Sequence, residues 1–143
     1  MTVQILSIKK SQQRLYLLRK LLSLDVSREL LQIVYKSLVE SVLTFNVVVW
    51  YGNLGVKGKT KLARIVGMAG KITGAKQDSP SDLYFTAVER KTARILDDAK
   101  HPLCSQFQKL RSGRRYKRPI ARKNVYKKTF IPSAISVLNS RAT

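Results

Sequence analysis

The stretch SRELLQIVYKSLVESVLTF, from Ser27 to Phe45, decides the fold that this sequence predicts. Its apolar residues recur at steps of three and four, the spacing that brings side chains onto one face of an α-helix. Ser27 suits the N-cap position, and Glu29 stands in the first turn, where the helix dipole favours a negative charge. The stripe that we expect to face a core consists of Leu31, Val34, Leu38, Val42 and Phe45.

A second helix is expected upstream, from Lys9 to Leu24, because leucines recur there at helical spacing: Leu15, Leu18, Leu21 and Leu22. Four cations lie elsewhere around this helix and make it basic and amphipathic: Lys10, Arg14, Arg19 and Lys20. The interruption at Leu24, Asp25 and Val26 ends it. The two helices would therefore form a helical hairpin.

The segment FNVVVWY, from Phe45 to Tyr51, is ambiguous because its valines favour a strand while the helical periodicity runs straight into it. We favour a continued helix that ends before Gly52. A third helix is predicted from about Lys59 to Thr73, with Gly74 as its C-terminal cap. Its inner face would carry Leu62, Ile65, Val66, Ala69 and Ile72.

The clearest helix start is at Ser79, whose side chain can cap the N-terminus of a helix. Pro80 would occupy the first turn of that helix, and Asp82 would complete a capping box. That fourth helix would end near Asp98, and a last short helix would begin at Phe130. The pattern predicts an all-α fold. We expect a helical domain over residues 9–110, a basic arm over residues 111–129, and a short C-terminal helix and tail over residues 130–143.

Length and composition narrow the classes further. The chain has 143 residues, of which 44% are hydrophobic, which suits one domain with a modest core. Its single cysteine, Cys104, permits no internal disulfide, so nothing indicates an oxidising compartment. The longest apolar run, Val42 to Tyr51, is interrupted and shorter than the roughly 20 residues that span a bilayer, so we expect no transmembrane helix. The N-terminal residues do not resemble a signal peptide.

Charge is concentrated in the stretch RSGRRYKRPIARKNVYKK, from Arg111 to Lys128. The last acidic residue is Asp98, so the twelve Lys and Arg residues of 99–143 give that segment +12 of the chain's formal net charge of +20. Such a segment repels itself, and a phosphate backbone relieves this repulsion with release of counterions. Gly113 and Pro119 disfavour helix. The alternative for such a run is a solvated, partly disordered tail.

Residues for other chemistry are sparse. His101 and Cys104 could supply half of a zinc site, but the chain has no second pair. Asp97 and Asp98 are the only adjacent acids, and a two-metal site needs further carboxylates, so a surface charge cluster is favoured. The glycines and lysines of residues 52–59 form no phosphate-binding motif. Trp50 and Tyr51 could stack on bases, although core packing is favoured because valines precede them.

Five ordered blocks resemble the C-terminal region of non-LTR, LINE-type retrotransposon reverse transcriptases. They are SQQRLYLLRKL, VYKSLVESVLTFNVVVWYGNL, KTKLARIVGMAGKITG, SGRRY and KKTFIPSAISVLN, within Lys9 to Asn139. The resemblance implies a thumb and post-thumb region that holds template RNA and primer DNA. Family members usually carry Pro at the position of Arg111, and RYR at Tyr116 to Arg118. The catalytic palm, with its [FY]-x-D-D box, is absent from these residues.

Residues Lys9 to Phe45 are also similar to a segment named after the N-terminus of AlkB-like proteins, which pair a 2-oxoglutarate dioxygenase with a tRNA methyltransferase. That chemistry needs an HxD…H iron site and a glycine-rich strand-turn-helix, and the chain has one histidine and no such loop. A non-functional gene relic, with helices that fold poorly alone, is a further alternative.

The sequence therefore predicts a basic nucleic-acid-binding module without catalytic residues, metal or cofactor. The expected partners are RNA and DNA, and the rest of a reverse transcriptase, with no membrane. Twelve residues are expected to contact nucleic acid, the two tyrosines by stacking: Lys10, Arg14, Arg19, Lys20, Arg114, Arg115, Tyr116, Lys117, Arg118, Arg122, Lys123 and Tyr126.

Overall fold

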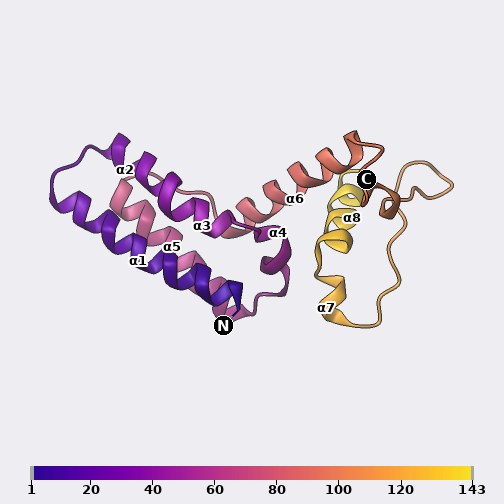
Figure 1. The fold of residues 1–143 in the computed structure, drawn as a ribbon, viewed down its shortest axis with the longest axis horizontal. Helices are drawn as coiled ribbons and strands as arrows, with labels where there is room; N and C mark the ends of the chain where they lie inside the picture. Colours follow the sequence, from indigo (N-terminus) through magenta and orange to yellow (C-terminus); the bar gives the residue numbers. More distant parts are fainter. Residues whose placement is uncertain (1, 143) are drawn as a thin grey trace.

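The computed structural model describes residues 2–142, which form a chain of helices (Figure 1). The elements are α1 (Val3–Ser23), α2 (Arg28–Val34), a π-helical turn (Tyr35–Glu40), α3 (Ser41–Thr44), α4 (Val47–Trp50), a 3₁₀ turn (Tyr51–Asn53), α5 (Val56–Thr73), α6 (Pro80–Asp97), a second 3₁₀ turn (Cys104–Gln106), α7 (Asn124–Lys127) and α8 (Phe130–Arg141). Within the described residues no strand occurs, and one isolated bridge joins Lys109 to Tyr116. The predicted all-α fold is confirmed.

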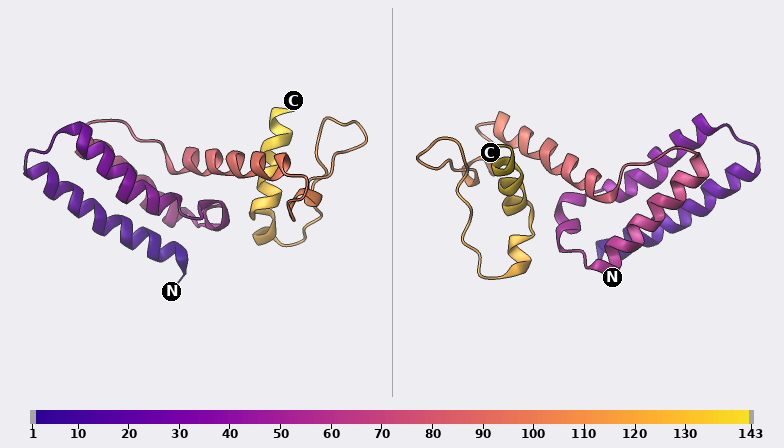
Figure 2. Two further views of the ribbon diagram at one scale, coloured as in Figure 1. Left: turned by 45° about the horizontal axis from the view of Figure 1, so that its top comes forward. Right: turned by 180° about the vertical axis from the view of Figure 1, so that it is seen from behind.

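Three helical segments pack together at the N-terminal side of the molecule. α1 lies against the continuous helix α2–α3 and against α5, as Figures 1 and 2 both show. α6 leads away from this unit and packs against α8, next to the long loop that precedes α7. The predicted hairpin turn is present: α1 ends at Ser23, and Asp25 has a left-handed backbone with a φ of 54°.

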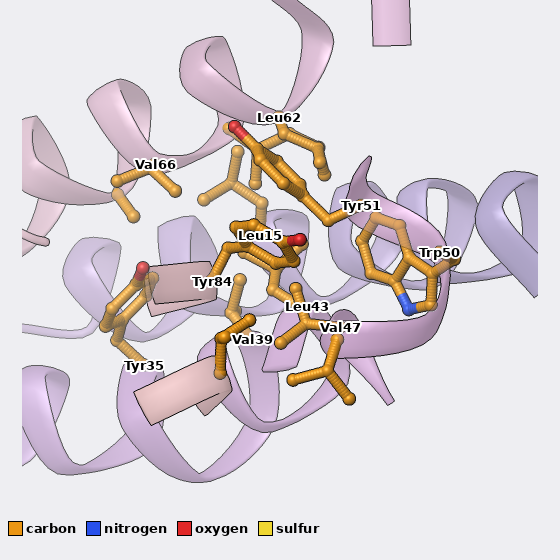
Figure 3. Close-up of a cluster of buried hydrophobic side chains, with 14 of the residues drawn as sticks. Leu15, Tyr35, Val39, Leu43, Val47, Trp50, Tyr51, Leu62, Val66 and Tyr84 are labelled. Atoms are coloured by element: carbon orange, nitrogen blue, oxygen red, sulfur yellow. The ribbon is translucent and has the colours of Figure 1, made fainter. Parts of the chain in front are cut away.

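The inner side of α2–α3 is a line of every fourth residue, all buried: Leu31, Tyr35, Val39 and Leu43. Figure 3 shows the last three of these within the core cluster. This differs from the predicted stripe, since Val34, Leu38 and Val42 are half-buried and Phe45 is exposed. The cause is the π-helical turn at Tyr35–Glu40, whose wider winding turns the chain less per residue than an α-helix. Residues four apart therefore stay in register with the core.

The inner line of α1 also departs from the leucine pattern. Ser7 and Ser11 are buried with Leu15 and Leu18, whereas Leu22 is exposed. The Ser11 hydroxyl donates to the Ser7 carbonyl at 2.7 Å, so its polar atom is satisfied within the helix. Small side chains at these two positions are compatible with close packing of the first half of α1 on its neighbours.

The ambiguous segment after α3 is helical but not continuous. Asn46 adopts a left-handed conformation with a φ of 50°, which asparagine tolerates, and α4 begins after it. The Trp50 indole Nε1 donates to the Phe45 carbonyl at 2.9 Å across this turn. Trp50 and Tyr51 are buried, so the favoured assignment of both to the core is confirmed.

Both ends of the middle helices follow local chemistry. The Ser79 hydroxyl accepts from the Asp82 amide at 3.1 Å, which confirms the predicted start of α6. Gly74 caps α5 with a φ of 70°, as predicted. α5 begins at Val56, three residues before the expected Lys59.

Gly52 lies so close to the Lys128 carbonyl oxygen that a Cβ there would overlap it. The N-terminal unit meets the end of α7 at this point.

One described helical stretch, Arg28–Asn53, has the length and composition of a membrane span, with a mean hydropathy of 1.4 over its most apolar 18 residues. This corrects the expectation above, which counted only uninterrupted apolar residues. In this structure 33% of that window is buried, and its buried line packs on α1 and α5. The same composition is typical of the core helix of a folded domain.

The revised core line predicts unequal effects for two identical substitutions on α2–α3. Leu31→Ala removes a fully buried side chain and should lower the free energy of unfolding by about 2–5 kcal/mol. Leu38→Ala, at a half-buried position beside that line, should cost clearly less. Chemical denaturation of both variants measures the difference. Equal losses would show that the core side of this helix is assigned wrongly.

Candidate nucleic-acid interface

The basic arm begins as a hairpin-shaped loop. Lys117 N donates to the Gln108 carbonyl at 2.7 Å, and Leu110 N donates to the Arg115 carbonyl at 2.8 Å. Gly113, at the tip, has a φ of 69°, a conformation in which glycine is favoured. The turn is closed by Gly113 N, which donates to the Leu110 carbonyl at 2.8 Å. These bonds give the arm a defined backbone between residues 108 and 117.

A side-chain amide ties this loop to α8. Asn139 is buried, and its Oδ1 accepts from the Tyr116 amide at 2.7 Å while its Nδ2 donates to the Tyr116 carbonyl at 3.0 Å. The asparagine thus bonds both backbone groups of one residue, as a neighbouring strand would. The base of the arm is thereby fixed to the helical framework.

The two tyrosines of the arm differ in their surroundings. The Tyr116 ring is half-buried, lies edge-on to Phe107 with the centroids 6.3 Å apart, and has Lys109 Nζ 5.9 Å from its centroid. Part of this ring is therefore used in packing, and its role in base stacking stays a prediction. Tyr126, on α7, is 44% exposed. Of the two, Tyr126 offers the more accessible face.

The predicted cations of the arm are all exposed: Arg114, Arg115, Lys117, Arg118, Arg122 and Lys123. Within residues 2–142 there is one ion pair, between Arg141 and Glu89. None of these six side chains is therefore paired with a carboxylate of the described residues. Arg118 lines two grooves beside the loop. One, of about 410 Å³, also contains Arg115 and Ser136, and the other, of about 440 Å³, also contains Lys117 and Ile131. The structure thus brings Arg115, Lys117 and Arg118 together.

The second basic face predicted on α1 does not form as one surface. Arg14 is half-buried, and its Nη1 donates to the Leu38 carbonyl at 2.6 Å, so it joins the two helices of the hairpin. Arg19 Nη2 instead lies 3.1 Å from Met68 Sδ of α5. The two arginines therefore point toward different neighbours. Lys10 and Lys20 remain exposed without a contact of this kind.

Further cations, which the sequence analysis missed, gather around α6. Arg90, Lys91 and Arg94 line a cleft of about 590 Å³ between this helix and the α3–α4 region. Part of this arrangement could be predicted from the sequence, since Arg90 and Arg94 are four residues apart and therefore lie on one side of a helix that was predicted correctly. What the sequence could not show is which element faces them.

His101 and Cys104, the two residues that could supply half of a zinc site, make local contacts within the fold. His101 Nδ1 accepts from the Leu103 amide at 3.1 Å, and Cys104 is half-buried against the core. Among the described residues, no group of three or more metal-ligating side chains occurs.

Comparison with protein families gives one match, to the family model described as "Alkylated DNA repair protein alkB homolog 8, N-terminal", over residues 1–41. This segment is less than a third of the 143 residues and ends at Ser41, the first residue of α3. The chain is therefore similar to that family in its N-terminal hairpin alone, and the arm and α6 lie outside the match. No curated protein and no solved structure matches the chain.

The arm should supply affinity without being needed for folding. Replacing Arg114, Arg115, Lys117 and Arg118 by Ala removes four exposed charges and no core. The salt dependence of RNA binding should then flatten by about three to four units of d log K/d log[salt]. The melting temperature should stay nearly the same. Salt-titrated filter binding and a thermal melt measure the two effects.

Asn139→Ala provides the matched control, because it leaves every charge in place but unties the Tyr116 backbone. Two part-buried hydrogen bonds are lost, so the free energy of unfolding should fall by roughly 1–3 kcal/mol. The salt dependence should stay close to that of the wild type. A collapse of melting temperature in the four-alanine variant would show instead that the arm is packed.

Proposed function

We propose that this chain is a nucleic-acid-binding module that holds RNA and DNA by their phosphate backbones. The observation that carries the proposal is the anchored basic arm, in which exposed arginines and lysines lie close together without carboxylates to pair them. Asn139 fixes the base of this arm, so part of the ordering cost of binding is already met.

Electrostatics favour a polyanion over other partners. The chain carries a formal net charge of +20, and a phosphate backbone both relieves its self-repulsion and releases counterions. Arginine also forms bidentate, charge-assisted hydrogen bonds to phosphate. Contacts of this kind carry little sequence information, so the binding is proposed to be largely sequence-independent.

More specifically, we infer a thumb and post-thumb region of a non-LTR retrotransposon reverse transcriptase. The support is the resemblance of five ordered blocks between Lys9 and Asn139 and the joining of a helical unit to a basic arm. In this role the chain positions template and primer, while catalysis belongs to a palm that these residues do not include. Its protein partner would be the remainder of that polymerase, and the chain by itself is not an enzyme.

A second candidate rests on the family match over residues 1–41. In it, the hairpin belongs to a protein related to AlkB homologue 8, with oxidoreductase and tRNA methyltransferase chemistry elsewhere. The residues of this chain do not fit the iron site of such a dioxygenase, since it has one histidine. Titration of this chain with Fe(II) and 2-oxoglutarate tests for such a site within these residues, and binding of both would contradict the first candidate.

The proposed function predicts a steep dependence on salt. If about six phosphates are neutralised, log K for RNA or DNA should fall with log salt at a slope of roughly −4 to −5. Filter binding between low and physiological salt measures it. A slope near zero would contradict the proposal.

Folding of the isolated chain needs its own check, because the gene-relic alternative predicts helices that fold poorly alone. We expect soluble protein and a single cooperative thermal transition. An aggregated or non-cooperative product would favour the relic.

A further inference from the structure

The cleft beside α6 has the form of a binding site that the arm does not include. It encloses about 590 Å³, within the size range of small-ligand pockets. One wall is α6, and the other is the end of α3 with the start of α4. Its lining is divided between cations on α6 and a mixed apolar and polar surface opposite.

The α6 wall is a stripe along one side of that helix: Leu83, Ala87, Arg90 and Arg94. The two arginines are one turn apart, about 6 Å along the axis, so they can neutralise neighbouring phosphates of one strand. Both are exposed, and neither is paired with a carboxylate within residues 2–142. Lys91, also in the lining, lies with its Nζ 5.0 Å from the Phe130 ring centroid and is held at the α8 side.

The rest of the lining suits a base rather than a phosphate. Half-buried Leu83 and Ala87 on α6 supply the accessible apolar surface, whereas Val47 and Val48 opposite them are only 3% and 7% exposed. Asn46, beside these valines, is exposed and makes no capping hydrogen bond with its side chain. Glu40 lines the same wall as Asn46 and is half-buried, and this burial raises the pKa of its carboxyl. An amide and a carboxylate offer donor and acceptor groups to a base edge.

We propose that this cleft holds one nucleotide unit of a single-stranded nucleic acid, with phosphates on Arg90 and Arg94 and the base against Leu83 and Ala87, next to Asn46. The inference rests on the proposed function and names a site within it. A single strand is favoured over a duplex because this apolar surface can meet a base face only where that base is unpaired.

The direct test uses the variant Arg90→Ala/Arg94→Ala and fluorescence anisotropy with a 5′-fluorescein-labelled 12-nucleotide oligo(U). Affinity should fall roughly 10- to 100-fold, because charge-assisted contacts each contribute on the order of tenfold. The salt slope should flatten by about 1.4, the single-strand value for two phosphates. Binding of a 12-base-pair RNA duplex should change much less.

Two controls separate the cleft from charge in general. Lys57→Ala/Arg64→Ala removes the same charge from exposed positions of α5 and should bind oligo(U) like the wild type. Ala87→Phe keeps every charge but fills the cleft, and it should weaken oligo(U) binding with little change in salt slope. Thermal melts confirm that each variant is folded.

The outcomes distinguish this inference from the function beneath it. If the α5 and α6 double variants weaken oligo(U) binding equally, the cleft is not a site, although the module still binds nucleic acid. The same follows if the duplex and oligo(U) lose affinity alike. If the wild type binds neither probe, the proposed function fails together with the cleft.

Discussion

Burial of Leu31, Tyr35, Val39 and Leu43 along one side of α2–α3 is the constraint on which the other elements depend. This line gives α1 and α5 a common surface to pack on, and the π-helical turn keeps its four members aligned over about three turns. The helix then breaks at Asn46, which turns Val47, Trp50 and Tyr51 back into the core. The same break forms one wall of the cleft beside α6, so the core and the cleft share a cause.

Charge and core are kept apart in this molecule. Cations are too costly to bury without partners, and the chain has only eight acidic residues to pair with its 28 lysines and arginines. Twelve of these 28 cations lie on exposed positions of the arm and of α6, while contacts without formal charge help to fix the framework. The Asn139 amide on Tyr116 and the close approach of Gly52 to the Lys128 carbonyl are two such contacts.

Sequence reasoning predicted the elements whose signals are local. The Ser79 cap, the Gly74 cap and the hairpin turn at Asp25 depend on neighbouring residues, and all three are present. It failed where helix geometry or packing against another segment determines which side chains are buried. Leu38 and Phe45 fit an ideal helical stripe, which a π-helical turn displaces. Arg14 and Tyr116 were assigned to nucleic acid by residue type, yet the Arg14 guanidinium donates to the Leu38 carbonyl and the Tyr116 ring packs edge-on against Phe107.

The most direct test of the central claim, that a folded helical unit presents nucleic acid with a separate cationic surface, is an NMR titration of the labelled chain with unlabelled oligo(U). The account predicts backbone shift changes concentrated in residues 108–128 and in α6, with the buried positions of α1, α2–α3 and α5 nearly unchanged. Shift changes centred on α1, or spread evenly over the three-helix unit, would contradict it.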